Sequence, residues 1–360
     1  MKKVKEFTID LSKTEPKERL SSLLKSKRAL NKSTMLAENA YVEIQETLPK
    51  PELTAPIVRK LSSIGLKLRG TGDTGYMEEL KQWAIFTGLD ESYFASANLG
   101  YELTQLGTWA WNNVISKAAQ KWTKWSTCFA KNKGLCSSVA FYRPGIGMVH
   151  ARNMDWTLSG LRGATCLIHY KNGLAGDFTS VGVPGQIGVL SGVGKGRFSA
   201  TINLAPVGNI RPNITSGWSA LLLLRYVFEN CETYEDAVEE LLEAATVVPV
   251  FIQIVGPKKG QACIIEIMPR GENYYWEYDG SPLGITNHEP DDKNYEDIGD
   301  NQDGWTDSIP RLNKITGMAE KCKAKSLKGC MRVLLDYPVW GANTAQSMVM
   351  NAKTGDVLLQ

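Results

Sequence analysis

Apolar residues change their spacing near position 136, and this change divides the chain into two parts. In the first part they recur at helical intervals, as Leu80, Trp83 and Phe86 do, and further helices are predicted at 16–24 and 99–125. In the second part, short apolar runs at 137–142 and 148–152 predict two strands. We therefore expect a mainly helical segment over residues 1–135, followed by a strand-rich segment over residues 136–360.

The order of the predicted elements after residue 136 indicates an α+β fold. Strands are predicted at 164–170, 186–191 and 197–203, followed by helices at 214–229 and 233–245. Strands return at 250–255, 262–267, 274–279 and 283–287, and two short helices at 308–319 and 325–336 precede a hairpin at 346–351 and 355–359. This order lacks the strand–helix alternation of a parallel sheet. Two antiparallel sheets with helices packed outside them fit better.

Composition narrows the possible functions. Apolar residues make up 43% of the chain and the net charge is only +3, so a core can form and no strong field attracts nucleic acid. The seven cysteines include no Cys-x-x-Cys pair and the three histidines lack metal-ligand spacing, which predicts neither a zinc site nor a cofactor. The basic start has no apolar run behind it. This favours a cytoplasmic protein, with a secreted or lysosome-like compartment as the alternative.

Two runs at a fixed separation carry the candidate chemistry. They are Leu135-Cys136-Ser137-Ser138-Val139 and Gly147-Met148-Val149-His150-Ala151-Arg152-Asn153-Met154-Asp155-Trp156. Their pattern resembles that of the acid ceramidase and N-acylethanolamine acid amidase branch of the choloylglycine hydrolase family. The resemblance continues through the run 188–203, which ends at Asn203, and through Thr286-Asn287 and Arg311, with a further match at 98–103.

This resemblance implies a fold, a maturation step and an activity. The implied fold is a four-layer αββα Ntn-hydrolase sandwich, with the β subunit over 136–360 and a helical propeptide over 1–135. Cleavage between Leu135 and Cys136 would release the catalytic amino terminus, and the propeptide would stay bound as a tightly associated subunit. The implied activity is hydrolysis of linear amides, with a fatty acyl amide of the N-acylethanolamine or ceramide type as substrate and a thioester on Cys136.

Amide hydrolysis explains why such residues are needed. An amide is a poor electrophile, so the reaction requires a strong nucleophile, a base and donors for the oxyanion. A cysteine at a chain terminus carries its own base, because an α-amine titrates at about 7.7–8. The resemblance assigns the roles as follows: Cys136 as nucleophile, Arg152 near its sulfur, Asp155 on the α-ammonium, Asn203 and Asn287 as oxyanion donors, and Arg311 bracing the pocket or Asp155. Residues three apart on a flat strand point to opposite faces, so Arg152 and Asp155 share a site only if the strand bends or ends near Asn153.

Other interpretations stay open. A lone buried cysteine is usually a small core residue, and asparagines at strand ends are common in turns. Leu204 stands where acid ceramidases carry an acidic residue, which leaves a non-catalytic, unprocessed lipid-binding homologue as the main alternative. A bile-salt or penicillin amidase of the same family is another.

Two further segments have a chemical and a structural interpretation. The glycines over 70–75 fit a G-x-G-x-x-G pattern, but no buried strand precedes them, so a loop leading into a helix is favoured over a nucleotide site. The Trp/Lys segment 109–133 suits core packing of the propeptide or contact with a membrane surface.

Overall fold

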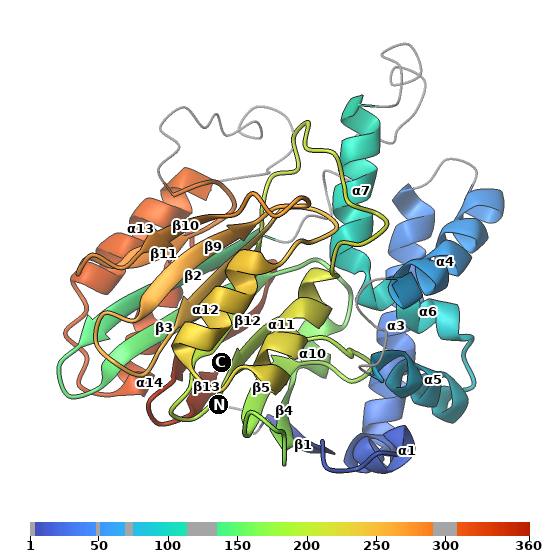
Figure 1. Cartoon of the computed structure of the whole chain (residues 1–360), viewed down its shortest axis with the longest axis horizontal. Helices are drawn as coiled ribbons and strands as arrows, with labels where there is room; N and C mark the ends of the chain where they lie inside the picture. Colours follow the sequence, from blue (N-terminus) through green and yellow to red (C-terminus); the bar gives the residue numbers. More distant parts are fainter. Residues whose placement is uncertain (1–3, 48–50, 69–74, 114–134, 291–307) are drawn as a thin grey trace.

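The computed structural model describes residues 4–47, 51–68, 75–113, 135–290 and 308–360. Its strands form two sheets, of eight and five strands (Figure 1). The eight-stranded sheet has the order β1 (Lys5–Asp10), β4 (Cys166–Lys171), β5 (Phe178–Gly182), β6 (Ser191–Val193), β7 (Ser199–Leu204), β8 (Val250–Val255), β9 (Ala262–Ile267) and β10 (Tyr274–Glu277). The five-stranded sheet has the order β11 (Leu283–Ile285), β2 (Leu135–Arg143), β3 (Gly147–Asp155), β12 (Thr344–Asn351) and β13 (Asp356–Leu359).

Helices cover the outer faces of both sheets. The helices α11 (Ala220–Asn230) and α12 (Tyr234–Glu243) pack on β7, β8 and β9. On the other side, α13 (Ser308–Glu320), α14 (Leu327–Cys330) and the 3₁₀ turn η1 (Met331–Leu334) pack on β2 and β3. The short helix α10 (Leu161–Ala164) follows β3. The predicted α+β fold with two sheets is confirmed, and the layers run helix, sheet, sheet, helix.

A buried polar network between the sheets fixes the face that each strand presents. The Ser138 hydroxyl on β2 is 3.0 Å from Nε2 of His150 on β3 and donates to Gln253 on β8. Burial, together with the charge of Arg152, lowers the pKa of His150 to about 3, so this imidazole stays neutral. Because a slip of one residue would turn these groups out of the network, the network also fixes the face on which Cys136 lies, two residues before Ser138.

The segment before residue 114 is mainly helical. Its helices are α1 (Pro16–Arg19), α2 (Ser21–Leu24), α3 (Lys27–Thr47), α4 (Pro51–Leu68), α5 (Tyr76–Thr87), α6 (Glu91–Asn98) and α7 (Gly100–Asn113). They lie together on one side of the molecule (Figure 1). The segment also contributes β1, which pairs in parallel with β4 and which the sequence did not predict. The N-terminal segment therefore shares a sheet with the rest of the chain.

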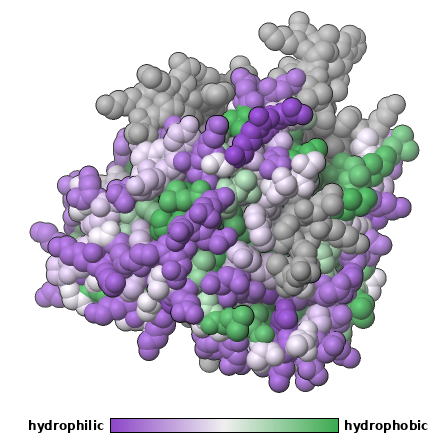
Figure 2. Space-filling view, viewed as in Figure 1, coloured by the Kyte–Doolittle hydropathy of each residue, from purple (hydrophilic) through white to green (hydrophobic). Residues whose placement is uncertain are grey.

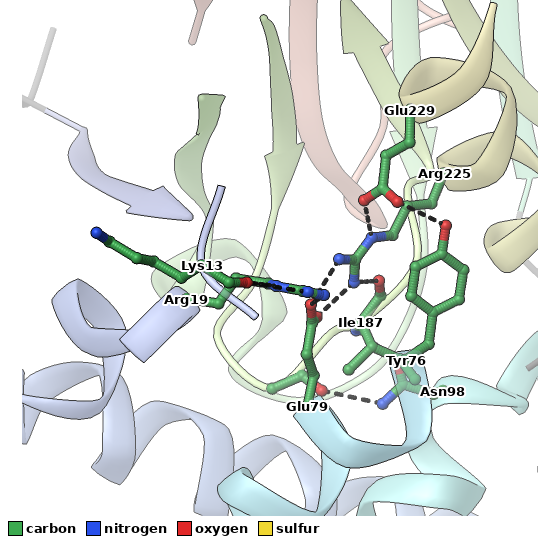
Figure 3. A network of polar contacts seen from close by, with 9 residues as sticks. Lys13, Arg19, Tyr76, Glu79, Asn98, Ile187, Arg225 and Glu229 are labelled. Atoms are coloured by element: carbon green, nitrogen blue, oxygen red, sulfur yellow. Dashed lines mark hydrogen bonds and ion pairs between the residues drawn. The ribbon is translucent and has the colours of Figure 1, made fainter. Parts of the chain in front are cut away.

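An ion-pair network joins this segment to α11 (Figure 3). Both carboxylate oxygens of Glu79 on α5 accept from the guanidinium of Arg225, at 2.6 and 2.8 Å, and Arg19 adds a third bond at 3.0 Å. Neither Glu79 nor Arg225 is exposed. Although burial favours the neutral acid, the two arginines lower the pKa of Glu79, so the carboxylate stays charged. Tyr76 and Arg225 both bind Glu229 and extend the network.

Residues in the range 98–103, which the sequence matched to a propeptide, also connect the N-terminal segment to the rest of the chain. The side chain of Asn98 donates to the Gly185 carbonyl at 2.9 Å and accepts from the Ile187 N–H at 2.8 Å. One carboxylate oxygen of Glu102 accepts from the N–H of Ala220, which is the first residue of α11. These residues bind α6 and α7 to loops and helices of the strand-rich segment.

Several predicted elements differ from those observed. The predicted strand at 186–191 is wrong, because the N–H groups of Ile187 and Val189 bond to Asn98 and to the Leu221 carbonyl instead of a neighbouring strand. A side chain at Gly188 would collide with Leu221, so the close approach of this loop to α11 requires glycine there. The predicted helix at 16–24 is divided at Leu20 into α1 and α2, and the one at 325–336 into α14 and η1. The end of the predicted helix at 99–125 and most of the glycines over 70–75 lie outside the described residues.

One helix of the N-terminal segment presents an apolar face to solvent. Leu53, Ile57, Leu61 and Ile64 of α4 are each more than half exposed, at a spacing that places them on one side of the helix. In Figure 2, hydrophobic surface gathers at the edge where Figure 1 places α4. Among the described residues, no helix has both the length and the hydropathy needed to cross a bilayer.

Candidate active site

Cys136 is the second residue of β2, and its side chain points between the two sheets beside Arg152. The Nη2 of Arg152 donates to the sulfur at 3.3 Å, and both residues are buried. Three further acceptors fix the guanidinium: the Leu190 carbonyl at 2.8 Å, the Ser191 hydroxyl and the Ile202 carbonyl. A permanent positive charge held against the sulfur stabilises negative charge on it.

Asn287 and Arg311 hold the backbone of the same cysteine. The N–H of Cys136 donates to Oδ1 of Asn287 at 3.1 Å, and its carbonyl accepts from Nη1 of Arg311 at 2.6 Å. Arg311 also donates to Oδ1 of Asn287 at 2.8 Å, which closes a ring of three residues. Asn287 follows β11 and Arg311 lies in the first turn of α13, so the sheet and its covering helix both position the cysteine.

The two asparagines bind strand ends beside Cys136. Nδ2 of Asn203 on β7 donates to the carbonyls of Ile285 and Thr286, at 3.2 and 3.0 Å. Nδ2 of Asn287 donates to the Leu204 carbonyl at 2.9 Å. In this structure both amide nitrogens therefore hold the ends of β7 and β11 next to each other. Their role as oxyanion donors stays a prediction.

Asp155 is the last residue of β3 and lies opposite Leu135 on β2. Two residues earlier, Asn153 points to the outer face and donates to the Leu334 and Val339 carbonyls. Alternation along the strand puts Asp155 on that outer face and Arg152 on the inner one, and the strand ends at Asp155. Burial raises the pKa of Asp155 to about 6, against a hydrogen bond from Thr344 and the charges of Arg311 and Arg152. A hydrogen bond between Asp155 and the Cys136 nitrogen is absent from the described residues, and this predicted contact stays a prediction.

A largely apolar cavity lies beside the cysteine. Its volume is about 190 Å³, several times the ~30 Å³ that one water molecule occupies in the liquid. The walls come from both parts of the chain: Leu36, Ala37, Ala40 and Leu103 lie before residue 136, and Met154, Trp156, Leu158, Ile202 and Leu204 lie after it. Cys136 itself lines the cavity, so its sulfur is next to a space that can hold an apolar group.

Three residues of the site could not be identified from the sequence. Ser191 accepts from Arg152, Thr344 bonds to Asp155, and Gln346 lines the cavity. Ser191 lies within the run 188–203, but nothing in that run indicates a bond to an arginine 39 positions away. Thr344 and Gln346 come from β12, which reaches the site only because it pairs with β3. No local pattern marks them.

Two packed sheets with outer helices, and a cysteine and an arginine between them, define a protein of the Ntn-hydrolase class. A family model described as acyl-coenzyme A:6-aminopenicillanic acid acyl-transferase matches residues 143–338, more than half of the chain. The chain belongs to this family. The matched residues include Arg152, Asp155, Asn203, Asn287 and Arg311, whereas Cys136 precedes them.

Curated relatives include acid ceramidases. The acid ceramidase of Balaenoptera acutorostrata scammoni is 25% identical over 154 residues, which is 36% of this chain and 39% of that protein. The acid ceramidase of Mus musculus is 24% identical over 159 residues, with the same shares. The match spans about two fifths of these relatives' length. The predicted relation to the acid ceramidase branch is confirmed at this distant level.

Similar solved structures come from amidases of two kinds. One is the Caenorhabditis elegans N-acylethanolamine-hydrolyzing acid amidase ortholog, with 21% identity, coverage of 61% of this chain and 94% of that one, and a TM-score of 0.48. Another is a mutant of the conjugated bile acid hydrolase from Clostridium perfringens, with 11% identity, coverage of 62% of this chain and 88% of that one, and a TM-score of 0.42.

Proposed function

We propose that this protein is a self-processing cysteine amidase in which Cys136 is the nucleophile. The observation that carries the proposal is the contact of 3.3 Å between Arg152 and the Cys136 sulfur, at the wall of an apolar cavity. Burying the charged guanidinium of Arg152 costs free energy even with its four acceptors. A purely structural cysteine would not require such a neighbour. Membership of an acyl-transfer family supports the same chemistry.

The first reaction is on the chain itself. The Cys136 thiolate attacks the Leu135 carbonyl, a carbon–sulfur bond forms, and the Leu135–Cys136 carbon–nitrogen bond breaks. The released nitrogen takes the proton that the thiol gave up and becomes an α-amine. Water then hydrolyses the thioester, which returns the thiol and leaves Leu135 as a free carboxyl end. Residues 1–135 become the α subunit, and residues 136–360 become the catalytic subunit of an αββα Ntn-hydrolase sandwich.

The second reaction repeats this chemistry on an amide substrate. The α-amine of Cys136 accepts the thiol proton and passes it to the leaving amine, because an α-amine titrates at about 7.7–8 and lies within reach of its own side chain. The acyl group is transferred to the sulfur and is released by water. Asn287 and Arg311 are already bonded to the backbone of Cys136 and would hold the new amino terminus in place.

The cavity supports a fatty N-acyl amide as substrate. Apolar side chains of α3 and α7 face those of the strand-rich segment across it, and such walls bind an acyl chain by removing it from water. An N-acylethanolamine or a ceramide has such a chain. A bile-salt or penicillin-type amide is the alternative substrate within the same chemistry.

Intact mass and turnover together test the proposal. We expect the wild-type chain to yield two fragments that meet at Leu135 and Cys136, and to hydrolyse long-chain N-acyl amides. Cys136→Ala should abolish both, whereas Cys330→Ala, at another buried cysteine, should leave both intact. A wild-type chain that stays whole and binds fatty amides without hydrolysing them would instead establish the lipid-binding alternative, which Leu204 favours.

We also propose contact with a membrane surface, from which such substrates would be drawn. The predicted segment 109–133 lies mostly outside the described residues. The apolar face of α4 supports the proposal, because a row of exposed Leu and Ile side chains on an amphipathic helix partitions into a lipid interface. α4 packs against α3, and α3 lines the cavity, so one helix separates the exposed face from the substrate site.

A further inference from the structure

We propose that Gln186 and Gln346 form a polar subsite that binds a hydroxyl group of the substrate close to the scissile amide. The inference rests on the proposed amidase function and adds a feature that the substrate must carry. Both glutamines line the cavity that contains Cys136. Neither belongs to the motifs that suggested the catalytic residues.

The position of Gln346 follows from the strand register. Cys136 on β2 lies opposite Met154 on β3, and Met154 lies opposite Gln346 on β12. Residues directly opposite each other point to the same face, so all three side chains face the cavity. Two strand spacings separate Cys136 from Gln346, about 9–10 Å between their backbones. A small molecule whose amide is at the sulfur can therefore reach the glutamine with an atom near that amide.

A local irregularity of β12 lies directly before Gln346. The register shifts between Thr344, opposite Asp155, and Gln346, opposite Met154, so Ala345 is an extra residue in the strand. From Gln346 to Met350 the pairing with β3 is regular, and this regular register keeps Gln346 on the row of Met154 and Cys136.

Each glutamine has one amide atom without a partner in the described part of the chain. Gln346 is only 2% exposed; its Nε2 donates to Thr165 at 3.2 Å, and its Oε1 accepts nothing from the described residues. Nε2 of Gln186 is also buried and, within the same residues, donates to no acceptor. A buried polar atom of this kind gains much more from a ligand hydrogen bond than an exposed one, because it has already lost its water.

Both glutamines lie near one pair of residues on β4 and β5. Gln346 is bonded to Thr165, which directly precedes Cys166, and Cys166 pairs with Gly182 across β4 and β5. The side chain of Gln186 lies against Gly182, with its Oε1 only 3.3 Å from where a Cβ would stand. Both glutamines are therefore near the Cys166–Gly182 pair and line the same cavity, so one ligand group can meet the acceptor on one and the donor on the other.

This pair of atoms selects a hydroxyl group. A hydroxyl donates one hydrogen bond and accepts others, so it satisfies Oε1 of Gln346 and Nε2 of Gln186 together. A methyl group satisfies neither, and a carboxylate would place negative charge against Oε1. Two other polar residues of the cavity, Asn98 and Tyr101, already bond to the protein backbone. The hydroxyl can belong to the amine half or to the acyl half of the amide.

The test uses the processed enzyme and two substrate pairs with one saturated acyl chain. In the first pair the head groups are N-(2-hydroxyethyl) and N-ethyl; in the second, the N-ethyl amide carries either a 2-hydroxyacyl or a plain acyl group. We expect kcat/KM to favour the hydroxyl compound by at least about tenfold in one pair, which identifies the half that carries the hydroxyl. Gln346→Leu and Gln186→Leu should each bring that ratio toward one. Gln261→Leu, in the turn between β8 and β9 and away from the cavity, should keep it.

Two results would overturn the inference. One is hydrolysis of all three amides, of which the plain-acyl N-ethyl amide is common to both pairs, by the wild-type enzyme with no preference in either pair. The other is a preference that persists in both cavity variants. A thermal transition shows whether Gln346→Leu folds. If it does not, the kcat/KM ratios of the wild type and of Gln186→Leu still test the inference. Failure to hydrolyse any of the three amides would overturn the proposed amidase function as well, so the two failures are distinguishable.

Discussion

The backbone N–H of Cys136 donates to Oδ1 of Asn287 at 3.1 Å, so the atom that self-cleavage would convert into the catalytic amine is already held by a side chain. Asn287→Leu removes this acceptor and also leaves Nη2 of Arg311 without it. Hydrogen bonds that involve a charged group contribute about 1.5–3 kcal/mol, so we expect self-cleavage to slow by roughly 10- to 100-fold. A time course of intact mass measures the rate. Asn313→Leu, on the exposed side of α13, is the matched control, and equal rates in the two variants would contradict the assigned role.

The protonation state of Asp155 should affect both kcat/KM and the free energy of unfolding. Burial raises the pKa of this carboxyl to about 6, above the ordinary value of 3.8. If its carboxylate holds the α-ammonium of Cys136, kcat/KM should rise as pH increases through about 6. The Asp155→Asn variant should be less active, and its kcat/KM should lack this rise.

The sign of the stability effect follows from the same pKa. Between about pH 4 and 6 the folded state keeps a proton that the unfolded state has lost, so the raised pKa makes the free energy of unfolding fall as pH rises. The fall is of the order of 3 kcal/mol for two pKa units. Burial also raises the pKa values of Glu43 and Glu266, so the measurement is the difference between wild type and Asp155→Asn in urea unfolding at several pH values. Parallel curves over this range would count against a raised pKa at Asp155.

Breaking the network between α5 and α11 should destabilise the folded chain strongly. Arg225→Met leaves Glu79 charged, buried and with only Arg19 as a partner, and losing one partner of a buried pair typically costs about 3–5 kcal/mol. Replacing both, as Glu79→Leu with Arg225→Met, should recover most of the loss. Urea unfolding measures each variant. Lys171→Met, which breaks the exposed pair with Asp177, should cost no more than about 1 kcal/mol.

The same network predicts that the fragments stay together after cleavage. The N-terminal segment contributes β1 to the larger sheet, walls to the cavity and Glu79 to the network. We therefore expect the processed wild-type protein to elute as one complex in size-exclusion chromatography. Separation of the two fragments under native conditions would contradict this.

Membrane contact through α4 predicts a specific loss of lipid binding. Ile57→Asp or Leu61→Asp places a charge in the middle of the apolar face, and we expect at least a tenfold weaker binding to phospholipid vesicles in a sedimentation assay. Ile85→Asp is the control, because Ile85 of α5 is also exposed but lies outside the α4 face. An equal effect of all three variants, or none, would contradict a docking role for α4.

Spacing and capping patterns among neighbouring residues were enough to predict part of this structure from the sequence. The strand pair around Pro144-Gly145, the strands at 250–255 and 262–267, and the helix opened by Thr233 and Asp236 follow from spacing and capping that involve only neighbouring residues. The resemblance pointed to Cys136, Arg152, Asn287 and Arg311, and the last three contact Cys136 in the structure.

Tertiary structure decided what depends on residues distant in sequence. β1 is short and polar on one face, so only its pairing with β4 identifies it as a strand, whereas loop 186–190 is not a strand because α6 and α11 take its hydrogen bonds. Likewise, the sequence placed Arg152 near Cys136, but the contact of Arg311 with the Cys136 carbonyl and the alignment of Gln346 depend on sheet register and helix packing. Spacing along a chain determines local conformation and the order of chemical groups, while the packing of distant segments determines which of those groups meet.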